Sequence, residues 1–348
     1  MKRIRVAVVG ATGYTGAELY RLLSVHPTVE VVALVGHGKA GLPVGEAMPS
    51  LAGLVPGSVE SFDAASLAAR ADAVFCALPH GASARVVGEL RAHGLVVLDL
   101  SADFRLRDRA VHEAWYGPHH APERMAEAVY GLPELHRERI ARCDLIAVPG
   151  CFPTATLLPL APLFRAGLLL DGPIIVDAKT GVSGAGRAPS ERTHHPETSE
   201  GIRAYKIAGS HRHTVEIEQE LSALAGRAVG VTFTPHLAPM TRGILSTSYV
   251  RVKPEIEASR CIDEARRLYA GSPSVFVHEE GACPDTLWVR ASNRAHVSYA
   301  LDRRTGWLVA QGAIDNLVKG AAGQAIQCLN VRFGLEEGAG LAMPAAWP

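Results

Sequence analysis

The sequence lacks the features that mark several classes of protein. Its 35 basic and 35 acidic residues cancel, so its charge does not favour nucleic acid or an anionic membrane surface as a partner. No stretch approaches the ~18 consecutive apolar residues that span a bilayer. The basic and apolar start of the chain reaches a glycine-rich turn after Val9, too soon for a signal peptide. We therefore expect a cytoplasmic protein that binds neither nucleic acid nor membrane.

Cysteine is scarce, and its spacing argues against two kinds of site. No C-x-x-C pair occurs, which disfavours both a disulfide framework and a zinc site. The one faint metal-like pattern, at 194–197, has two adjacent histidines that point in different directions, so we expect no metal. Most of the cysteines are expected to be buried thiols that pack as small hydrophobes. The six are Cys76, Cys143, Cys151, Cys261, Cys283 and Cys328.

Over the first 150 residues, apolar runs typical of buried strands alternate with helical patterns. This alternation predicts parallel βαβ units, and hence a Rossmann-type, doubly wound α/β sheet. The chain is long enough for two domains of ordinary size. The predicted strands are 4–9, 29–35, 73–77, 96–100 and 144–148, and the predicted helices are 14–25, 64–70 and 83–93.

After about residue 150, strands follow one another with few helices between them, which predicts an α+β domain with a mixed or antiparallel sheet. We expect a cofactor domain at 1–150 and a catalytic, substrate and oligomerisation domain at 151–312. The segment 313–348, with a helix at 315–331, is expected to return to the first domain. The predicted strands are 174–178, 229–234, 245–252, 286–291, 296–301 and 308–311, and the other helices are 213–225 and 255–269.

A glycine-rich turn joins the first predicted strand to the first helix. Its glycines are spaced G-x-x-G-x-x-G, a variant of the dinucleotide-binding fingerprint. Gly10 permits the tight turn, Gly13 lets the backbone approach a pyrophosphate, and Gly16 allows close packing of helix and strand. The helix N-terminus then receives the phosphates. The expected cofactor contacts in this turn include Thr12, Tyr14 and Thr15; the alternative is a plain βα turn.

The residues after the second strand favour one cofactor over another. NAD-binding folds usually place an acidic residue there to hold the ribose hydroxyls. Here Val35 is followed by His37 and Lys39 with no acid, so a 2′-phosphate would find a cation. We therefore expect NADP(H), held in part by His37 and Lys39. The alternative is that Lys39 is only solvated.

Cys151 lies between an apolar strand and an apolar helix. Pro153 suits the first turn of that helix, where its missing N–H is no loss. The positive end of a helix dipole favours a thiolate over a thiol, so Cys151 is a candidate nucleophile. The alternative is an inert buried cysteine.

Two further segments offer partners for this cysteine. His211 and His213 precede a helix, and we expect a helix start to lower a histidine pKa and keep a base neutral. A capping segment is the alternative. The glycine-rich loop at 180–187 offers backbone amides for a nicotinamide or a phosphate, or is a flexible surface loop.

Nearly the whole chain resembles the N-acetyl-γ-glutamyl-phosphate reductase family of arginine biosynthesis, within the aspartate-semialdehyde dehydrogenase superfamily. Many ordered motifs together are more specific than any one alone. The matching segments are 10–16, 77–81, 99–106, 130–134, 149–154, 180–187, 209–219, 235–243 and 315–320.

The resemblance implies an oxidoreductase that converts an acyl phosphate to an aldehyde with NADPH through a cysteine thioester. It makes Cys151 the nucleophile and His211 the general acid and base. It also implies a homo-dimer or homo-tetramer. The substrate contacts that it implies are Arg105, Tyr205, His213 and Arg242, and the further cofactor contacts are Pro79, Ser183, Gly184 and Asn316.

Small departures from the family pattern remove no reacting group: Phe152 stands where tyrosine is usual, Val215 where proline is frequent, and Ala238 where valine is frequent.

Two enzymatic alternatives are the lysine-pathway relative, whose substrate is attached to a carrier protein, and aspartate-semialdehyde dehydrogenase. An NADP-binding redox sensor is the alternative that is not an enzyme. It leaves Cys151 and the histidine segment unexplained.

Overall fold

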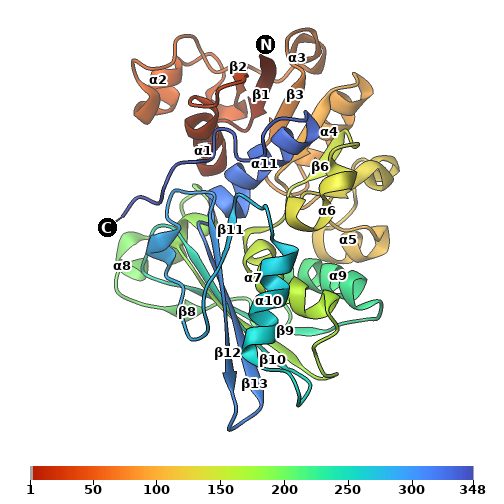
Figure 1. Ribbon diagram of the computed structural model, residues 1–348. Coiled ribbons are helices and arrows are strands. Elements are labelled where there is room, and N and C mark those ends of the chain that lie inside the picture. The colour runs from red at the N-terminus through yellow and green to blue at the C-terminus, as the bar shows by residue number, and fades with distance from the viewer. Residues whose placement is uncertain (1–2, 348) are drawn as a thin grey trace. The chain divides into compact units, whose positions relative to one another are not determined.

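The computed structural model describes residues 3–347, which divide into two units (Figure 1). The first unit contains the chain up to Pro149 together with Ala321–Ala342. The second contains Gly150–Gly320 and the residues from Met343 on. No helix in the described range 3–347 has the length and apolar character needed to cross a membrane.

The first unit holds a six-stranded parallel sheet in the order β2-β1-β3-β4-β6-β5. Strand β2 lies on one side of β1 and β3 on the other, so the direction in which successive strands are added reverses at β1. This reversal confirms the predicted doubly wound sheet. Strands β3 and β4 are buried along their whole length, as expected where helices cover both faces. The strands are β1 (Ile4–Val9), β2 (Val29–Val35), β3 (Ala73–Cys76), β4 (Val96–Asp99), β5 (Ala128–Tyr130) and β6 (Leu145–Ala147).

The helices of this unit include α11, whose Gln324 donates to the Gly131 carbonyl at 2.8 Å. Its Arg332 pairs with Asp144 at 2.6 Å. These bonds tie the C-terminal helix to the sheet of the first unit. The helices are α1 (Tyr14–Leu23), η1 (His37–Lys39), α2 (Val44–Ala47), η2 (Pro49–Leu51), α3 (Ala64–Arg70), α4 (Ser83–Ala92), α5 (Arg109–Tyr116), η3 (Pro122–Glu127), α6 (Pro133–Ile140) and α11 (Gly323–Arg332).

A buried polar network holds the loop that follows β3. Ser83 and Ser101 donate to the Asp99 carboxylate at 2.6 and 2.7 Å, and Asp103 accepts the N–H groups of Gly81 and Ala84. Burial raises the pKa of Asp99 to about 6. The loop is thereby fixed at the carboxyl ends of the strands, the edge where doubly wound sheets bind ligands.

The second unit holds a seven-stranded sheet in the order β11-β12-β13-β10-β7-β9-β8. The pairs β7–β9 and β11–β12 are parallel and the others antiparallel, so the predicted mixed sheet is confirmed. The strands are β7 (Ile174–Thr180), β8 (Arg203–Ala204), β9 (Val231–Leu237), β10 (Ile244–Arg251), β11 (Val275–Val277), β12 (Ala295–Asp302) and β13 (Trp307–Ile314).

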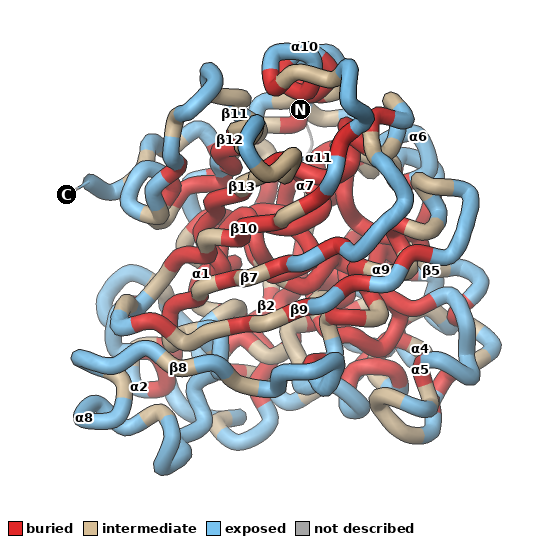
Figure 2. The backbone as a smooth tube through the Cα atoms, turned by 90° about the horizontal axis from the view of Figure 1, so that it is seen from below, coloured by how far each residue is buried: buried red, intermediate tan, exposed pale blue. Residues whose placement is uncertain are grey.

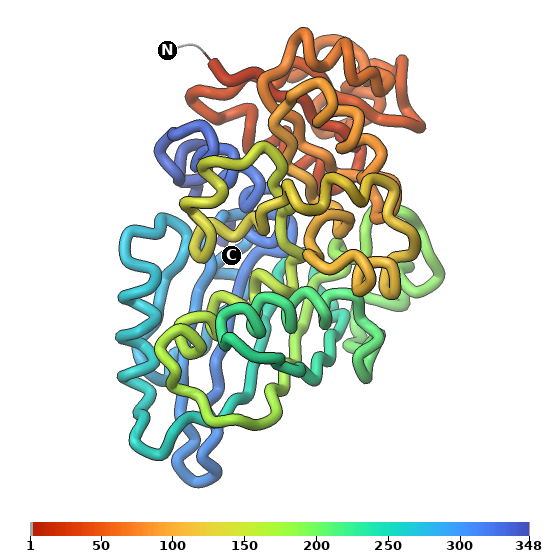
Figure 3. Tube along the Cα trace, turned by 90° about the vertical axis from the view of Figure 1, so that its right-hand side faces the viewer, coloured from red at the N-terminus to blue at the C-terminus, as the bar shows by residue number. Residues whose placement is uncertain are grey.

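Helices α7 and α9 pack side by side on this sheet (Figure 3), and α10 packs on its β11–β12 end. The central strands are largely buried, whereas the chain around α8 and β8 is mostly exposed (Figure 2). The helices are α7 (Cys151–Arg165), η4 (Val182–Ala185), η5 (Glu191–Thr193), α8 (His195–Thr198), α9 (His213–Ala225), α10 (Ala258–Leu268), η6 (Thr286–Trp288) and the π-helix η7 (Val318–Ala322), which runs on into the first unit.

Beyond its first turn, helix α7 contains two prolines, Pro159 and Pro162, that remove backbone donors. Pro162 cannot bond the Leu158 carbonyl, and the Tyr269 hydroxyl donates to that oxygen at 2.6 Å instead. The Tyr299 hydroxyl donates to the Pro159 carbonyl at 2.8 Å. A tyrosine far away in sequence therefore replaces the backbone donor that Pro162 lacks, and a second one adds a bond to the same helix.

Three predictions about elements are wrong. Residues 286–291 are not a strand, because the Asp285 side chain accepts the Leu287 N–H at 2.9 Å and caps the short helix η6. The helix expected from residue 255 begins at Ala258. The helix expected from residue 315 is preceded by a π-turn, and its α-helical part begins at Gly323.

Candidate active site

Cys151 is the first residue of α7, and Gly150 is the N-cap. Gly150 has no side chain with which to cap this helix, so Cys151 lies at the positive end of the helix dipole. Cys151 is half-buried, whereas burial raises the pKa of Cys143 to about 11 and that of Cys261 to about 12. Those two thiols stay protonated near neutral pH, which distinguishes them from a cysteine at a helix start.

A buried carboxylate fixes the residue before the cysteine. Glu216, on α9, is 1% exposed, and its Oε1 accepts the Gly150 N–H at 2.8 Å. The sequence analysis did not single out Glu216. Its role depends on the packing of α9 against α7, for which the sequence carries no local signal.

His211 is buried within a group of aromatic rings. Its ring centroid lies 5.5 Å from that of Tyr205, 5.5 Å from Phe152 and 5.3 Å from Phe233. Burial, assisted by the charges of Lys206 and Arg212, lowers its pKa to about 4. The predicted lowering is confirmed, but burial rather than a helix start is its main cause.

A backbone hydrogen bond selects the tautomer of His211. The His213 N–H donates to Nδ1 of His211 at 3.1 Å. The neutral imidazole therefore carries its proton on Nε2, which can donate to a substrate oxygen. His213 begins α9, and its ring lies 4.8 Å from that of His211.

The turn before His211 is strained. Lys206 and Ala208 have φ values of 46° and 54°, a region that costs an ordinary residue ~1–2 kcal/mol. The turn brings Tyr205 against His211, and burial raises the pKa of Tyr205 well above its usual value, so that it stays a hydroxyl donor. The charge of Cys151 contributes to the same shift. Sequence reasoning missed Lys206, because its position depends on this turn.

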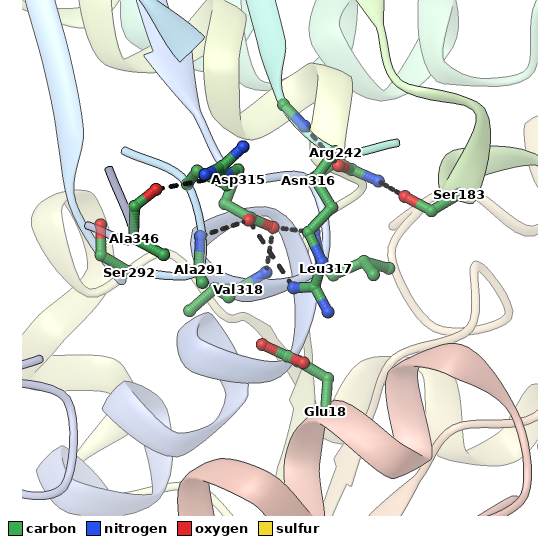
Figure 4. Close-up of polar contacts among 12 residues, drawn as sticks. Glu18, Ser183, Arg242, Ala291, Ser292, Asp315, Asn316, Leu317, Val318 and Ala346 are labelled. Atoms are coloured by element: carbon green, nitrogen blue, oxygen red, sulfur yellow. Dashed lines mark hydrogen bonds and ion pairs between the residues drawn. The ribbon is translucent and has the colours of Figure 1, made fainter. Parts of the chain in front are cut away.

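A second group of predicted residues meets around Asn316 (Figure 4). The Asn316 amide donates to Ser183 Oγ at 3.0 Å, and its Oδ1 accepts the Gly243 N–H at 2.8 Å. Gly184 lies within the same loop, where a Cβ would stand 3.7 Å from the Asn316 amide nitrogen. Asn316 therefore fixes the loop that carries Ser183 and Gly184.

Arg242 lies in the same group. Its Nη1 is 3.7 Å from the carboxylate of Asp315, which is fully buried (Figure 4). Sequence reasoning did not single out Asp315, whose function as an anchor depends on the fold.

The predicted phosphate-binding turn has the expected geometry. Gly10 has a φ of 83°, and a Cβ there would stand 2.3 Å from the Ala77 carbonyl. A Cβ on Gly16 would stand 2.4 Å from the Gly10 carbonyl. Gly13 is the N-cap of α1, without a side-chain cap, and a Cβ there would meet only the Gly10 carbonyl, at 3.5 Å. This helix end therefore fits a pyrophosphate.

The other cofactor candidates lie nearby in the first unit. Tyr14 and Thr15 open α1, and the Thr12 side chain lies next to Gly36 at the end of β2. His37 and Lys39 form η1 directly after β2. Pro79 is exposed in the loop after β3.

Arg105, predicted to contact substrate, is largely occupied by the backbone. It is 6% exposed, and its guanidinium donates to the carbonyls of Val148 and Leu100, each at 2.8 Å. Among residues 3–347, no group of three or more His, Cys, Asp and Glu side chains is arranged to hold a metal. The second unit thus combines a cysteine at a helix start, a neutral histidine and hydroxyl donors, an arrangement suited to acyl transfer.

Two family models match the chain. One, described as "Semialdehyde dehydrogenase, NAD binding domain", matches residues 5–143. The other, described as "Semialdehyde dehydrogenase, dimerisation domain", matches residues 151–316.

The chain is similar along its length to proteins named N-acetyl-gamma-glutamyl-phosphate reductase. It is 49% identical to the one from Heliobacterium modesticaldum, with 99% of this chain and 100% of that protein covered. The relative from Desulforudis audaxviator is also 49% identical, with the same coverage.

Solved structures share the fold at low identity. Aspartate semialdehyde dehydrogenase II from Vibrio cholerae, complexed with ASA, has a TM-score of 0.73 at 17% identity, covering 96% of this chain and 99% of that one. The enzyme from Candida albicans with NADP has a TM-score of 0.68 at 18% identity, covering 95% and 98%.

Proposed function

The chain belongs to the N-acetyl-gamma-glutamyl-phosphate reductase family of semialdehyde dehydrogenases, and from this membership we infer that it reduces N-acetyl-L-glutamyl 5-phosphate to N-acetyl-L-glutamate 5-semialdehyde. It is an oxidoreductase of arginine biosynthesis. The observation that carries the mechanism proposed below is Cys151 at the start of α7, in the same unit as a neutral, buried His211.

We propose that the first step is acyl transfer to Cys151. The thiolate, favoured by the start of α7, attacks the acyl carbon, and the bond to the phosphate oxygen breaks with release of inorganic phosphate. A thioester at Cys151 results. Lys206 and Arg212, the cations that depress the pKa of His211, also favour the anionic phosphate electrostatically.

The second step is reduction of the thioester. The nicotinamide cofactor, when bound, would supply a hydride, that is, a proton with two electrons. His211 Nε2–H donates a hydrogen bond to the acyl oxygen, on which negative charge develops. Collapse of the resulting hemithioacetal releases the aldehyde and returns the thiolate. Tyr205, His213, Arg242 and Arg105 are proposed substrate contacts, of which Tyr205 and His213 lie against His211.

We propose NADP(H) as the cofactor, held by the glycine turn of the first unit and by Ser183, Gly184 and Asn316. The Lys39 ammonium donates to the Ala47 carbonyl at 2.7 Å and retains two further donors. A Lys39→Ala variant is expected to raise the KM for NADPH about 10-fold, as loss of a charged hydrogen bond implies, and to leave the KM for NADH unchanged. Steady-state kinetics with both cofactors test this, with Lys253→Ala as control. Equal effects on both cofactors would contradict it.

We also propose a homo-dimer or homo-tetramer that forms through the second sheet. Its α7-covered face holds residues such as Val250, whereas Tyr249, Val309 and Ile175 lie in register on the other face, half-buried or exposed. The matched dimerisation domain supports a second copy as the occupant. Tyr249→Lys is expected to shift the sedimentation coefficient toward the monomer, and Val111→Lys, in the first unit, to leave it unchanged. An unchanged assembly in Tyr249→Lys would refute this interface.

The six free cysteines suit the reducing cytoplasm that we propose as its location.

The first test of function is the reverse reaction, followed at 340 nm with N-acetylglutamate semialdehyde, NADP⁺ and phosphate, each omitted in turn. Strict dependence on phosphate supports thioester phosphorolysis. No signal with this aldehyde, together with signal from aspartate semialdehyde, would keep the mechanism and reject the substrate.

A further inference from the structure

A turn that follows β13 is wound more loosely than an α-helix. The Gly320 N–H donates to the Asp315 carbonyl at 2.9 Å, five residues back, which is the bond that defines a π-turn. π-turns occur mostly as single turns within helices, often at functional sites. The turn contains Asn316, a proposed cofactor contact, whereas Gly320 at its end has no proposed binding role.

Gly320 packs directly on the nucleophile. A methyl group built on it would stand 2.7 Å from Cβ and 3.2 Å from Cα of Cys151. Carbon atoms in contact normally lie about 3.5–4.0 Å apart. A side chain larger than hydrogen therefore displaces one of the two backbones by about 1 Å.

The start of the turn is anchored. Asp315 is fully buried, and its Oδ1 accepts the N–H groups of Leu317 and Val318 at 2.8 and 3.1 Å. Its Oδ2 accepts the Ala291 N–H at 2.7 Å. The turn therefore cannot easily move away from α7 to make room for a side chain at Gly320.

The residue before the cysteine is fixed as well. Glu216 holds the N–H of Gly150, the residue before Cys151, at 2.8 Å. Cys151 thus lies between a hydrogen bond to its preceding residue and a van der Waals contact on its own Cα and Cβ. Together these contacts restrict the direction in which the Cα–Cβ bond projects from α7.

We propose that Gly320 is a positioning residue for the reaction, whose bare Cα sets the direction of the Cys151 sulfur. The proposal rests on the proposed function, because direction matters for turnover only if Cys151 is the nucleophile. A misplacement of about 1 Å in a reacting group lowers turnover by about 10²-fold. The effect is expected in kcat, since Gly320 is not a proposed substrate contact.

The test is Gly320→Ala, measured by steady-state kinetics and by the pH dependence of Cys151 alkylation with iodoacetamide. We expect kcat to fall about 10²-fold, KM to change less than about two-fold, and the alkylation midpoint to shift, because the sulfur moves relative to the helix start. Gly172→Ala, where a Cβ meets no atom within 4 Å, is the neutral control.

Gly312→Ala separates positioning from general damage to α7, because its Cβ would stand 2.2 Å from the Ala155 carbonyl, beyond the first turn. We expect it to lower the melting temperature without shifting the alkylation midpoint. If Gly320→Ala is too unstable to purify, Leu317→Ala loosens the turn without adding atoms, and the same fall in kcat at constant KM is expected.

Wild-type kcat and an unshifted alkylation midpoint in a folded Gly320→Ala variant would overturn the proposal. An equal shift in Gly312→Ala would also overturn it. If the proposed function is wrong, Cys151→Ser would turn over like the parent enzyme. If only the positioning role is wrong, Cys151→Ser would be inactive and Gly320→Ala would remain active.

Discussion

Replacing Cys151 with serine is expected to lower phosphate-dependent turnover by at least about 10⁴-fold, because a serine hydroxyl stays protonated where the thiol ionises at the start of α7. Both steps of the proposed mechanism require the thioester, so no partial reaction replaces it. Cofactor binding is expected to remain, since the glycine turn belongs to the first unit. The measurement is the reverse assay at 340 nm combined with titration of NADPH fluorescence.

Cys283→Ser is the matched control, since Cys283 is exposed and far along the chain from α7. It is expected to keep full activity. Mass spectrometry of the enzyme mixed with acyl phosphate without cofactor adds a direct readout: the parent enzyme gains one acyl group, and Cys151→Ser gains none. Parent-level turnover in Cys151→Ser would rule out covalent catalysis.

Replacing His211 with glutamine is expected to lower kcat about 10²–10⁴-fold, the contribution typical of a positioned proton donor. Because burial lowers the pKa of His211 to about 4, the imidazole is neutral above that pH. Protonation of His211 below pH ~5 adds a second N–H that opposes the His213 N–H at Nδ1. Titration of His211 should therefore not change the kcat/KM of the parent enzyme between pH ~5 and 7. Below pH ~5, kcat/KM should fall as His211 becomes protonated.

Lys206 gives this pH dependence a specific test. Its positive charge lowers the pKa of His211, so Lys206→Met is expected to raise that pKa and move the acid limb of kcat/KM to higher pH. Lys253→Met, which removes an exposed lysine elsewhere in the second unit, should leave the limb in place. A limb centred near pH 6.5 in the parent enzyme would contradict the assignment of a buried, neutral His211.

The sequence predicts those parts of the site whose cause is local. Gly10 and Gly16 are predictable from local causes, because Gly10 has a positive φ in a tight turn and a Cβ on Gly16 would meet the Gly10 carbonyl six residues before it. The place of Cys151 follows similarly from Gly150 before it and Pro153 after it. Long buried strands were predicted because apolar runs mark them.

What the sequence could not predict depends on packing between distant residues. Glu216 binds Gly150 across 66 positions, and Gly320 meets Cys151 across a longer interval still. Strands β5, β8 and β11 have only two or three residues, too few for an apolar pattern to show. The wrong strand at 286–291 has strand-like residues, but the Asp285 cap decides its conformation.

The prolines of α7 bear on when the enzyme becomes reactive during its synthesis. The helix lacks backbone bonds at Pro159 and Pro162, and hydroxyls of Tyr269 and Tyr299 satisfy carbonyls 111 and 140 positions earlier. An isolated α7 is thus a poor helix, and its dipole matures only after those tyrosines have been translated. Because a helix start lowers a thiol pKa only where the helix is formed, Cys151 gains its nucleophilic character only once the second unit has folded.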